Sequence, residues 1–256
     1  MGRIIAIANQ KGGVGKTTTA VNLSAALAAR GKRTLVVDMD PQGNTTSGLG
    51  LDKNELEKTT YEVITDQYSI HECIAEDLFE NLSLLPANRN LAGAEIELMT
   101  VDRMQFIIKD NLDKVKDNYE FIIIDCPPAL GMLTVNAMTA ADTVIVPIQC
   151  EFYALEGLTQ LIYTIELIQK SLNPKLEIEG VVFTMYDART NLSLQVVENV
   201  KSYLNQNIYK TIIPRNVRLA EAPSHGLPIN LYDPSSVGAE SYGYLAEEVI
   251  ENGGIE

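Results

Sequence analysis

The sequence has no tryptophan and only three cysteines among its 256 residues. Cys73, Cys126 and Cys150 are odd in number and far apart, so they indicate neither a disulfide framework nor a CxxC metal site. We expect buried free thiols. No apolar run reaches the ~18 residues of a membrane-spanning helix, and the N-terminus has no signal-peptide pattern. These absences predict a cytoplasmic protein without a transmembrane segment.

Positive charge is also scarce. The chain has 20 Lys and Arg against 34 Asp and Glu, a net charge of −14, which argues against a surface coated in basic residues for nucleic acid. The stretch from Met185 to Arg218 is different, because it holds two acidic residues (Asp187, Glu198) and five basic ones (Arg189, Lys201, Lys210, Arg215, Arg218). It carries +3, which leaves −17 for the remainder. The stretch could be a local basic patch or a solvated helix face, and composition alone favours the solvated face.

Length and composition fit one large globular unit. A chain of 256 residues with 46% hydrophobic and 21% charged residues can bury a full-sized core. No linker, internal repeat or low-complexity segment interrupts it. We therefore predict a single domain over residues 1–256.

Residues 3–18 organise the chain. Their apolar run IIAIA predicts a buried parallel strand, and GGVGKTT then turns sharply into a segment of helical period. Glycines let backbone N–H groups converge on an anion, and the following helix N-terminus adds partial positive charge. Lys16 places a cation on the outer phosphates, and the Thr17 hydroxyl can bind Mg²⁺. The stretch predicts a phosphate-binding loop.

This loop departs from the general template G-x-x-x-x-G-K-[ST]. Gln10 stands at the first glycine position, and a second lysine, Lys11, follows it. A glycine turn with incidental lysines is a poor alternative, because the loop directly follows a strand pattern and precedes a helix. KGGVGKTT is the deviant Walker A pattern, and on it the sequence resembles the ParA/MinD branch of P-loop ATPases.

Two aspartates follow buried strand patterns. TLVVD ends at Asp38, and Asp40 then lies at the carboxyl end of that strand beside a Pro-Gln-Gly turn, at the sheet edge where ligands bind. Taken alone, Asp40 reads as a turn cap. In YEFIIIDCPP, Asp125 ends an apolar run before two prolines, which is a Walker B arrangement that can hold Mg²⁺ through water.

Strand and helix patterns alternate along the rest of the chain. Strands are predicted over 81–87, 142–149, 178–187 and 208–214, and helices over 17–30, 91–115 (mostly helical), 153–172, 191–206 and 236–252. Residues 44–80 lack one clear period: they hold a glycine-rich loop, TSGLGLD, and short amphipathic pieces around 61–64 and 70–74. In the helix over 153–172, spacing favours a core role for Leu155, Leu158, Ile162, Ile165 and Ile168. The alternation predicts an α/β fold, a mostly parallel twisted sheet with helices on both faces.

Further motifs extend the resemblance. DMDPQGN, IIIDCPP, QCEFYALEGL, DARTN and IPRNVRLAEAPSHG, in this order, are similar to those of the ParA or Soj family of chromosome- and plasmid-partitioning ATPases, and they cover essentially the whole chain. The resemblance implies the P-loop NTPase fold, with ATP and Mg²⁺ as ligands. The implied phosphate cradle is Gly12, Gly13, Val14, Gly15, Lys16, Thr17 and Thr18. Thr17 and Asp125 would serve Mg²⁺, and Pro214 and Asn216 match the loop that reads the adenine edge.

The resemblance also implies three roles beyond nucleotide binding. Lys11 is the signature lysine that crosses a dimer interface to the other subunit's nucleotide, in the manner of an arginine finger, and acts with Lys16 in catalysis. Asp40 resembles the carboxylate that orients the attacking water. Arg189 and Arg218 belong to the surface that meets DNA in the ATP-bound dimer.

Two departures from the family pattern affect these expectations. DPSSVGAE at 233–240 has no arginine, whereas some relatives carry basic residues there, so the DNA surface is expected to be weaker or differently placed. Cys126 and Cys150 resemble cysteines of iron–sulfur relatives on this scaffold, but packed thiols fit the surrounding pattern better.

The resulting hypothesis is a cytoplasmic, nucleoid-associated ATPase that is weak alone and stimulated by a ParB-type centromere-binding protein. ATP would join two subunits, the homodimer would bind double-stranded DNA without sequence preference, and hydrolysis would release it. One alternative is a MinD-like membrane-cycling ATPase, although the acidic tail (Glu247, Glu248, Glu251, Glu256) has no Lys or Arg and an anionic membrane would repel it. Another is a biosynthetic P-loop ligase, for which no second motif is present.

Overall fold

The computed structural model describes residues 2–98, 101–151, 153–204 and 208–252. Its eight strands form one sheet in the order β3-β4-β2-β5-β1-β6-β7-β8, and only the β3–β4 pair is antiparallel. The strands are β1 (Arg3–Ile7), β2 (Thr34–Asp38), β3 (Ala75–Phe79), β4 (Leu82–Leu85), β5 (Phe121–Asp125), β6 (Thr143–Gln149), β7 (Glu177–Tyr186) and β8 (Ile208–Pro214). The predicted mostly parallel sheet is confirmed.

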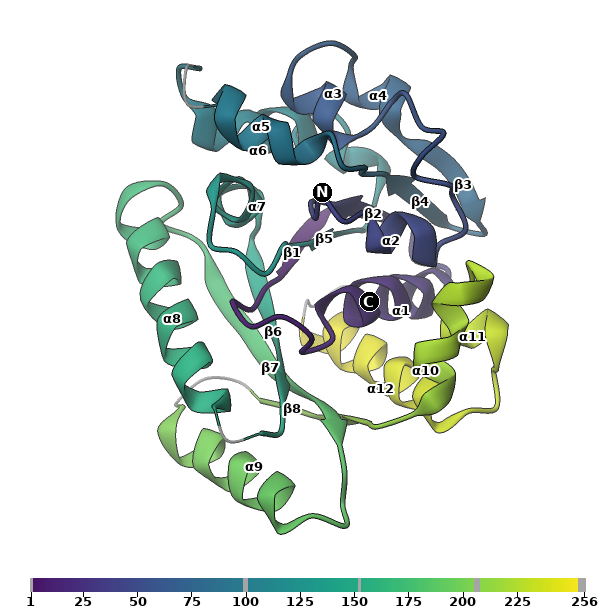
Figure 1. Ribbon diagram of the computed structural model, residues 1–256, viewed down its shortest axis with the longest axis vertical. Helices are drawn as coiled ribbons and strands as arrows, with labels where there is room; N and C mark the ends of the chain where they lie inside the picture. The colour runs from purple at the N-terminus through teal and green to yellow at the C-terminus, as the bar shows by residue number, and fades with distance from the viewer. Residues whose placement is uncertain (1, 99–100, 152, 205–207, 253–256) are drawn as a thin grey trace.

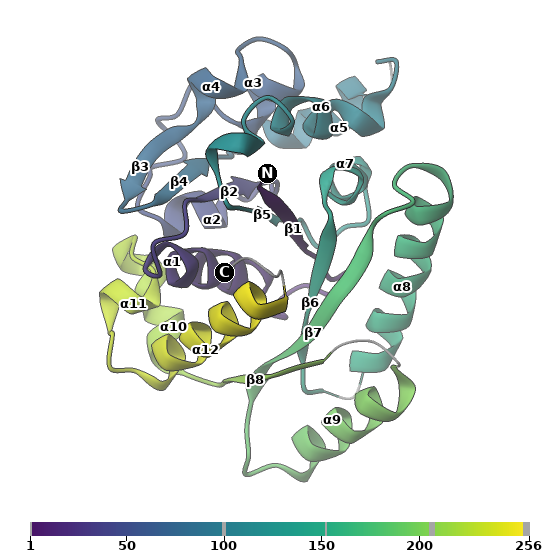
Figure 2. The ribbon, with the colours of Figure 1, turned by 180° about the vertical axis from the view of Figure 1, so that it is seen from behind.

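Helices cover both faces of this sheet (Figures 1 and 2). On one face lie α1 (Lys16–Ala28), α10 (Val217–Glu221), α11 (Ile229–Tyr232) and α12 (Val237–Asn252). On the other lie α3 (Thr60–Ile64), α5 (Leu91–Glu97), α6 (Ile107–Leu112), α7 (Met132–Ala140), α8 (Ala154–Ser171) and α9 (Asn191–Tyr203). The shorter elements are α2 (Asn44–Gly48), α4 (Ile70–Cys73) and the 3₁₀ turns η2 (Met104–Phe106), η3 (Lys116–Asn118) and η4 (Ala222–His225).

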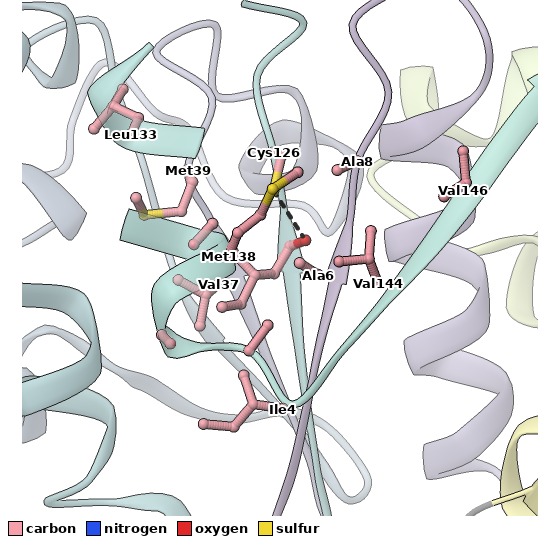
Figure 3. Close-up of a cluster of buried hydrophobic side chains, with 14 of the residues drawn as sticks. Ile4, Ala6, Ala8, Val37, Met39, Cys126, Leu133, Met138, Val144 and Val146 are labelled. Atoms are coloured by element: carbon pink, nitrogen blue, oxygen red, sulfur yellow. Dashed lines mark hydrogen bonds between the residues drawn. The ribbon is translucent and has the colours of Figure 1, made fainter. Parts of the chain in front are cut away.

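The central strand β1 divides its side chains between two hydrophobic cores. Ile5 and Ile7 pack with α1 and α12, whereas Ile4 and Ala6 join the core beneath α7 and α8. This is the alternation that a strand buried on both faces requires. Figure 3 shows the second core, in which the Cys126 thiol lies 3.9 Å from the Ile124 carbonyl oxygen. All three cysteines are free and buried as expected, and burial raises the pKa of each thiol.

Several local details differ from the predictions. The described part of 91–115 is mostly helical as predicted, but it is divided into α5, η2 and α6, and Arg103 takes a left-handed backbone (φ +57°) between α5 and η2. The TSGLGLD loop is partly helical, because α2 includes its first three residues. Strand β3 and helices α7, α10 and α11 were not predicted. In α8, Leu155 and Ile162 are only half-buried, and Leu161 takes a core position instead.

The amino-terminal edge of the sheet is fastened by a buried carboxylate on β7. Glu179 accepts hydrogen bonds from Thr143 Oγ1 on β6 (2.6 Å) and Tyr209 OH on β8 (2.8 Å). It also pairs with the Arg3 guanidinium on β1 at 2.9 Å. Arg3 in turn donates to the Val249 carbonyl of α12 at 3.0 Å. One carboxylate thereby connects four strands and, through Arg3, the last helix.

We expect Glu179→Ala to destabilise the fold by about 3 kcal/mol, because it leaves a largely buried guanidinium without its counter-ion. The measurement is the urea midpoint of unfolding. Glu177→Ala, an exposed position on the same strand, is the matched control and should unfold like the parent. Equal midpoints for the two variants would contradict this role for Glu179.

Candidate functional site

The loop between β1 and α1 is shaped to hold an anion. Gly13 and Gly15 have φ angles of +76° and +90°, which side chains with a Cβ rarely adopt. Gly15 precedes the first residue of α1, and no side chain caps that helix end. Thr184, a buried residue of β7, donates to the Val14 carbonyl at 2.7 Å and holds the loop against the sheet. The open helix N-terminus and the glycine backbone together suit a bound phosphate.

A cavity of about 680 Å³ opens in front of this loop. Its lining brings together nine of the predicted site residues: Gly12, Gly13, Gly15, Lys16, Thr17, Thr18, Asp40, Pro214 and Asn216. They come from three separate parts of the chain, namely the loop with α1, the turn after β2 and the end of β8. The volume is typical of small-ligand sites. Lys11, Val14 and Asp125 are not part of this lining.

Lys16 is buried beside the loop. Its ammonium donates to the carbonyl of Lys11 at 3.0 Å, so it lies over the loop. Burial lowers the pKa of Lys16, whereas the nearby Asp125 carboxylate acts in the opposite direction. A cation in this position can contact the outer phosphates of a bound nucleotide.

Two buried carboxylates lie behind the cavity. Asp38 and Asp125 occupy the same register position on the neighbouring strands β2 and β5. Oδ2 of Asp125 accepts hydrogen bonds from Thr17 (2.8 Å) and Thr45 (2.7 Å), while Oδ1 has no hydrogen-bond partner among the described residues. Burial raises the pKa of Asp125, and the charge on Asp38 adds to this rise. A buried carboxylate oxygen without a donor, close to a threonine hydroxyl, fits a Mg²⁺ site with oxygen ligands.

Asp38 is a site residue that sequence reasoning missed. Its Oδ2 accepts from the backbone and hydroxyl of Thr46 (2.9 and 2.7 Å), and its Oδ1 accepts from the backbone of Asp40 (3.1 Å). Burial raises the pKa of Asp38 as well. Asp38 ends its strand as Asp125 does, and that similarity was the available signal. The pairing of β2 with β5, which places the two side by side, is not readable from either strand alone.

Asp40 is placed for both roles that the sequence left open, the turn cap and a contact with the ligand. It caps its turn, because Oδ1 accepts from the Gln42 backbone at 2.9 Å and its carbonyl accepts from Gly43 at 2.8 Å. It also lines the cavity opposite the phosphate loop, with only 8% of its surface exposed. The structure therefore permits a contact between Asp40 and a bound ligand without removing the turn cap.

Lys11 lies at the rim and is bound within its own chain. Its ammonium forms an ion pair with Glu151, which follows β6, and about one-third of each side chain is exposed. Asn9 accepts from the Lys11 backbone at 3.0 Å and is itself tied to the Pro147 carbonyl at 2.7 Å. Glu151 belongs to the QCEFYALEGL motif, but the sequence assigned it no role.

The other predicted residues divide between the cavity and the surface. Asn216 lines the cavity and caps α10, accepting from the Arg218 backbone at 2.7 Å. Arg189 and Arg218 lie outside the cavity, with 87% and 54% of their side chains exposed. Each is paired with carboxylates of its own chain.

Comparison with known proteins gives the same picture. A family model described as an AAA domain matches residues 2–178. The sporulation initiation inhibitor protein Soj of Bacillus subtilis is 59% identical over 253 residues, covering 99% of this chain and 100% of that protein. The chain belongs to the ParA/Soj family of chromosome-partitioning ATPases.

Further relatives confirm the predicted family and fold. The chromosome-partitioning ATPase Soj of Treponema pallidum is 49% identical, covering 99% of both chains. Among solved structures, the cobyrinic acid a,c-diamide synthase of Mycobacterium smegmatis, with bound ADP and magnesium, matches this ParA/Soj chain with a TM-score of 0.88 and 37% identity. That match covers 100% of this chain and 96% of the synthase. Within the described residues, none of the helices is both long and apolar enough to span a membrane.

Proposed function

We propose that this chain, acting as one domain over residues 1–256, is an ATP-driven switch for DNA partitioning. The subunit binds ATP with Mg²⁺, two subunits join, and the homodimer binds double-stranded DNA without sequence preference. Hydrolysis, stimulated by a ParB-type protein, releases the DNA. The protein would accordingly act in the cytoplasm, associated with the nucleoid.

The observation that carries this proposal is the cavity in front of the glycine loop, together with the contact between Thr17 and the buried Asp125. A glycine loop with a buried lysine suits the phosphates, and Thr17 with Asp125 suits the magnesium ion. Mg²⁺ would supply charge neutralisation at the β- and γ-phosphates, as in other P-loop ATPases. Thr17 and Asp125 would hold that ion. Asp38 would fix the positions of Thr46 and of the Asp40 turn through its hydrogen bonds to them.

The rim position of Lys11 supports the dimer. Its side chain lies outside the cavity of its own subunit, so it is better placed to reach a nucleotide across an interface than to bind its own. The pair with Glu151 would have to exchange for the γ-phosphate when two subunits meet. Such a cation supplied by the other subunit stabilises the charge of the transferring phosphoryl group.

The DNA-binding step predicts the effect of Arg189→Glu. DNA affinity in the presence of ATP should fall by roughly a hundredfold at low salt, because a dimer loses two cations and gains two anions at the phosphate contact. ATP-dependent dimerisation should be unchanged. The measurement is duplex-DNA binding with a non-hydrolysable ATP analogue.

Arg33→Glu is the matched control for this experiment. Arg33 is also an exposed arginine. It precedes β2 and so lies at the amino-terminal ends of the parallel strands, whereas Arg189 follows β7 at their carboxyl-terminal ends. Arg33→Glu changes the net charge by the same amount and should bind DNA nearly as the parent does. Parent-like DNA binding by Arg189→Glu, or no DNA affinity of the parent dimer at low salt, would contradict the proposal.

Specific observations bear on two other functions, one against and one in favour. A membrane-cycling ATPase of the MinD type needs an amphipathic tail helix free to enter a membrane, but α12 buries its apolar face (Tyr242, Leu245, Ala246, Val249) against α1 and β8. Glu256, predicted as part of the acidic tail, lies outside the described residues. A biosynthetic amide ligase gains support from the similarity to the diamide synthase. Pelleting with liposomes and with DNA, each with and without ATP, separates these functions.

A further inference from the structure

Both arginines of the candidate DNA surface are held by carboxylates of the same chain. Asp187 follows β7 and binds Arg189 through two parallel contacts, Nε to Oδ1 at 2.8 Å and an NH2 group to Oδ2 at 2.7 Å. The hydrogen bonds from Arg189 lower the pKa of Asp187 to about 2. The carboxylate is charged at neutral pH, as an ordinary aspartate is, and it occupies the Nε–Nη2 edge of the guanidinium, one of the two edges through which a phosphate could bind with paired hydrogen bonds.

Arg218 is also held by carboxylates of its own chain, in this case by two of them. Its Nη1 lies 2.9 Å from Glu221 Oε2, and its Nε lies 3.3 Å from Asp233 Oδ2. Tyr232 adds a hydrogen bond to Glu221 at 3.3 Å, which fixes this carboxylate. Asp233 begins the segment 233–240, which has no arginine. That segment thus supplies Arg218 with an anion of the chain itself.

We propose that three carboxylates are autoinhibitory residues of the DNA surface: Asp187 holds Arg189, and Glu221 with Asp233 holds Arg218, until a DNA phosphate displaces them. The inference rests on the proposed DNA-binding function and concerns how strongly that surface binds. A phosphate and a carboxylate offer a guanidinium similar paired oxygens, so the exchange replaces one anion by another. Exposed ion pairs are individually weak, and DNA can therefore displace them.

This arrangement lowers both the affinity for DNA and its dependence on salt. An arginine that brings a carboxylate with it adds little net positive charge to the contact, so fewer counterions are released from the DNA. In a dimer each of these ion pairs occurs twice, once on each subunit. The consequence is a DNA contact that forms only when two subunits combine and that dissociates readily.

The test compares two variants with the parent: Asp187→Asn, which frees Arg189, and the double variant Glu221→Gln/Asp233→Asn, which frees Arg218 from both of its carboxylates. The asparagine side chain keeps an oxygen that can accept the Arg189 backbone hydrogen bond (3.0 Å in the parent), so the turn at Asp187 is retained. Each variant should bind duplex DNA about three- to tenfold more tightly at low salt, with a non-hydrolysable ATP analogue present. The logarithmic salt slope should steepen by about one to two, and the gain should shrink as salt rises.

Asp117→Asn is the matched control, because it removes one negative charge from an exposed position on η3, at the amino-terminal edge of the sheet. It should leave DNA affinity and salt slope as in the parent. Equal affinity and slope for the parent and both test variants would overturn the inference while leaving DNA binding intact. So would an equal gain from Asp117→Asn, which would be a general charge effect. Absence of DNA binding by the parent and all variants would overturn the proposed function itself, and the inference with it.

Discussion

Lys16→Ala loses ATP binding, with an expected fall in affinity of at least a hundredfold. The Lys16 ammonium is buried beside the glycine loop and is the cation placed to meet the outer phosphates. Without it, the triphosphate would face the buried Asp38 and Asp125 carboxylates with one compensating charge fewer. Isothermal titration calorimetry with ATP and Mg²⁺ measures this directly.

Lys11→Ala is the matched control in the same loop. Lys11 lies outside the cavity and pairs with Glu151, so its removal should leave ATP binding by the single subunit close to that of the parent. Both variants remove one positive charge, so a difference in their ATP affinity reports where each lysine lies and not the change in net charge. Unchanged ATP affinity of Lys16→Ala would overturn the assignment of the phosphate-binding loop.

The second large effect is expected for Asp40→Ala. If Asp40 positions the attacking water, the variant binds ATP and accumulates as a stable dimer, and turnover falls by roughly a hundredfold or more. The measurements are phosphate release and molecular mass in the presence of ATP.

Asp40→Asn separates this role from the turn cap. The asparagine oxygen can still accept from the Gln42 backbone, as Oδ1 of Asp40 does at 2.9 Å, but the amide has no negative charge to orient water. Asp40→Asn should therefore be as inactive as Asp40→Ala. Restored turnover in Asp40→Asn, or an Asp40→Ala variant that stays monomeric with ATP, would mean that Asp40 serves only the turn.

The sequence predicted those parts of the fold in which pattern and environment agree. Strands β1, β2 and β5 are continuous apolar runs because helices cover both faces of the sheet, so their limits were readable from composition. Strand β3 was missed because its burial is partial, as expected of an edge strand, and its sequence AEDLF lacks the apolar run. Helix α2 was missed because it has only five residues and its sequence, NTTSG, consists of residue types that favour turns and helix caps.

The candidate site follows the same rule. Residues of the phosphate loop were predictable because they act within one continuous segment. The carboxylate pair of Asp38 and Asp125, the Lys11–Glu151 pair and the Thr184 contact each depend on which strands are neighbours in the sheet. Strand order is a property of the whole fold, and no single motif of this chain encodes it.

If ATP controls the association of two subunits, the molecular mass of the protein must differ between its nucleotide states. Sedimentation of the parent with Mg²⁺ and ADP should give one subunit of 28.1 kDa. With Mg²⁺ and a non-hydrolysable ATP analogue, we expect twice that mass for the parent and the single-subunit mass for Lys11→Ala. The same mass for the parent in both nucleotide states would mean that ATP does not control the association of the subunits.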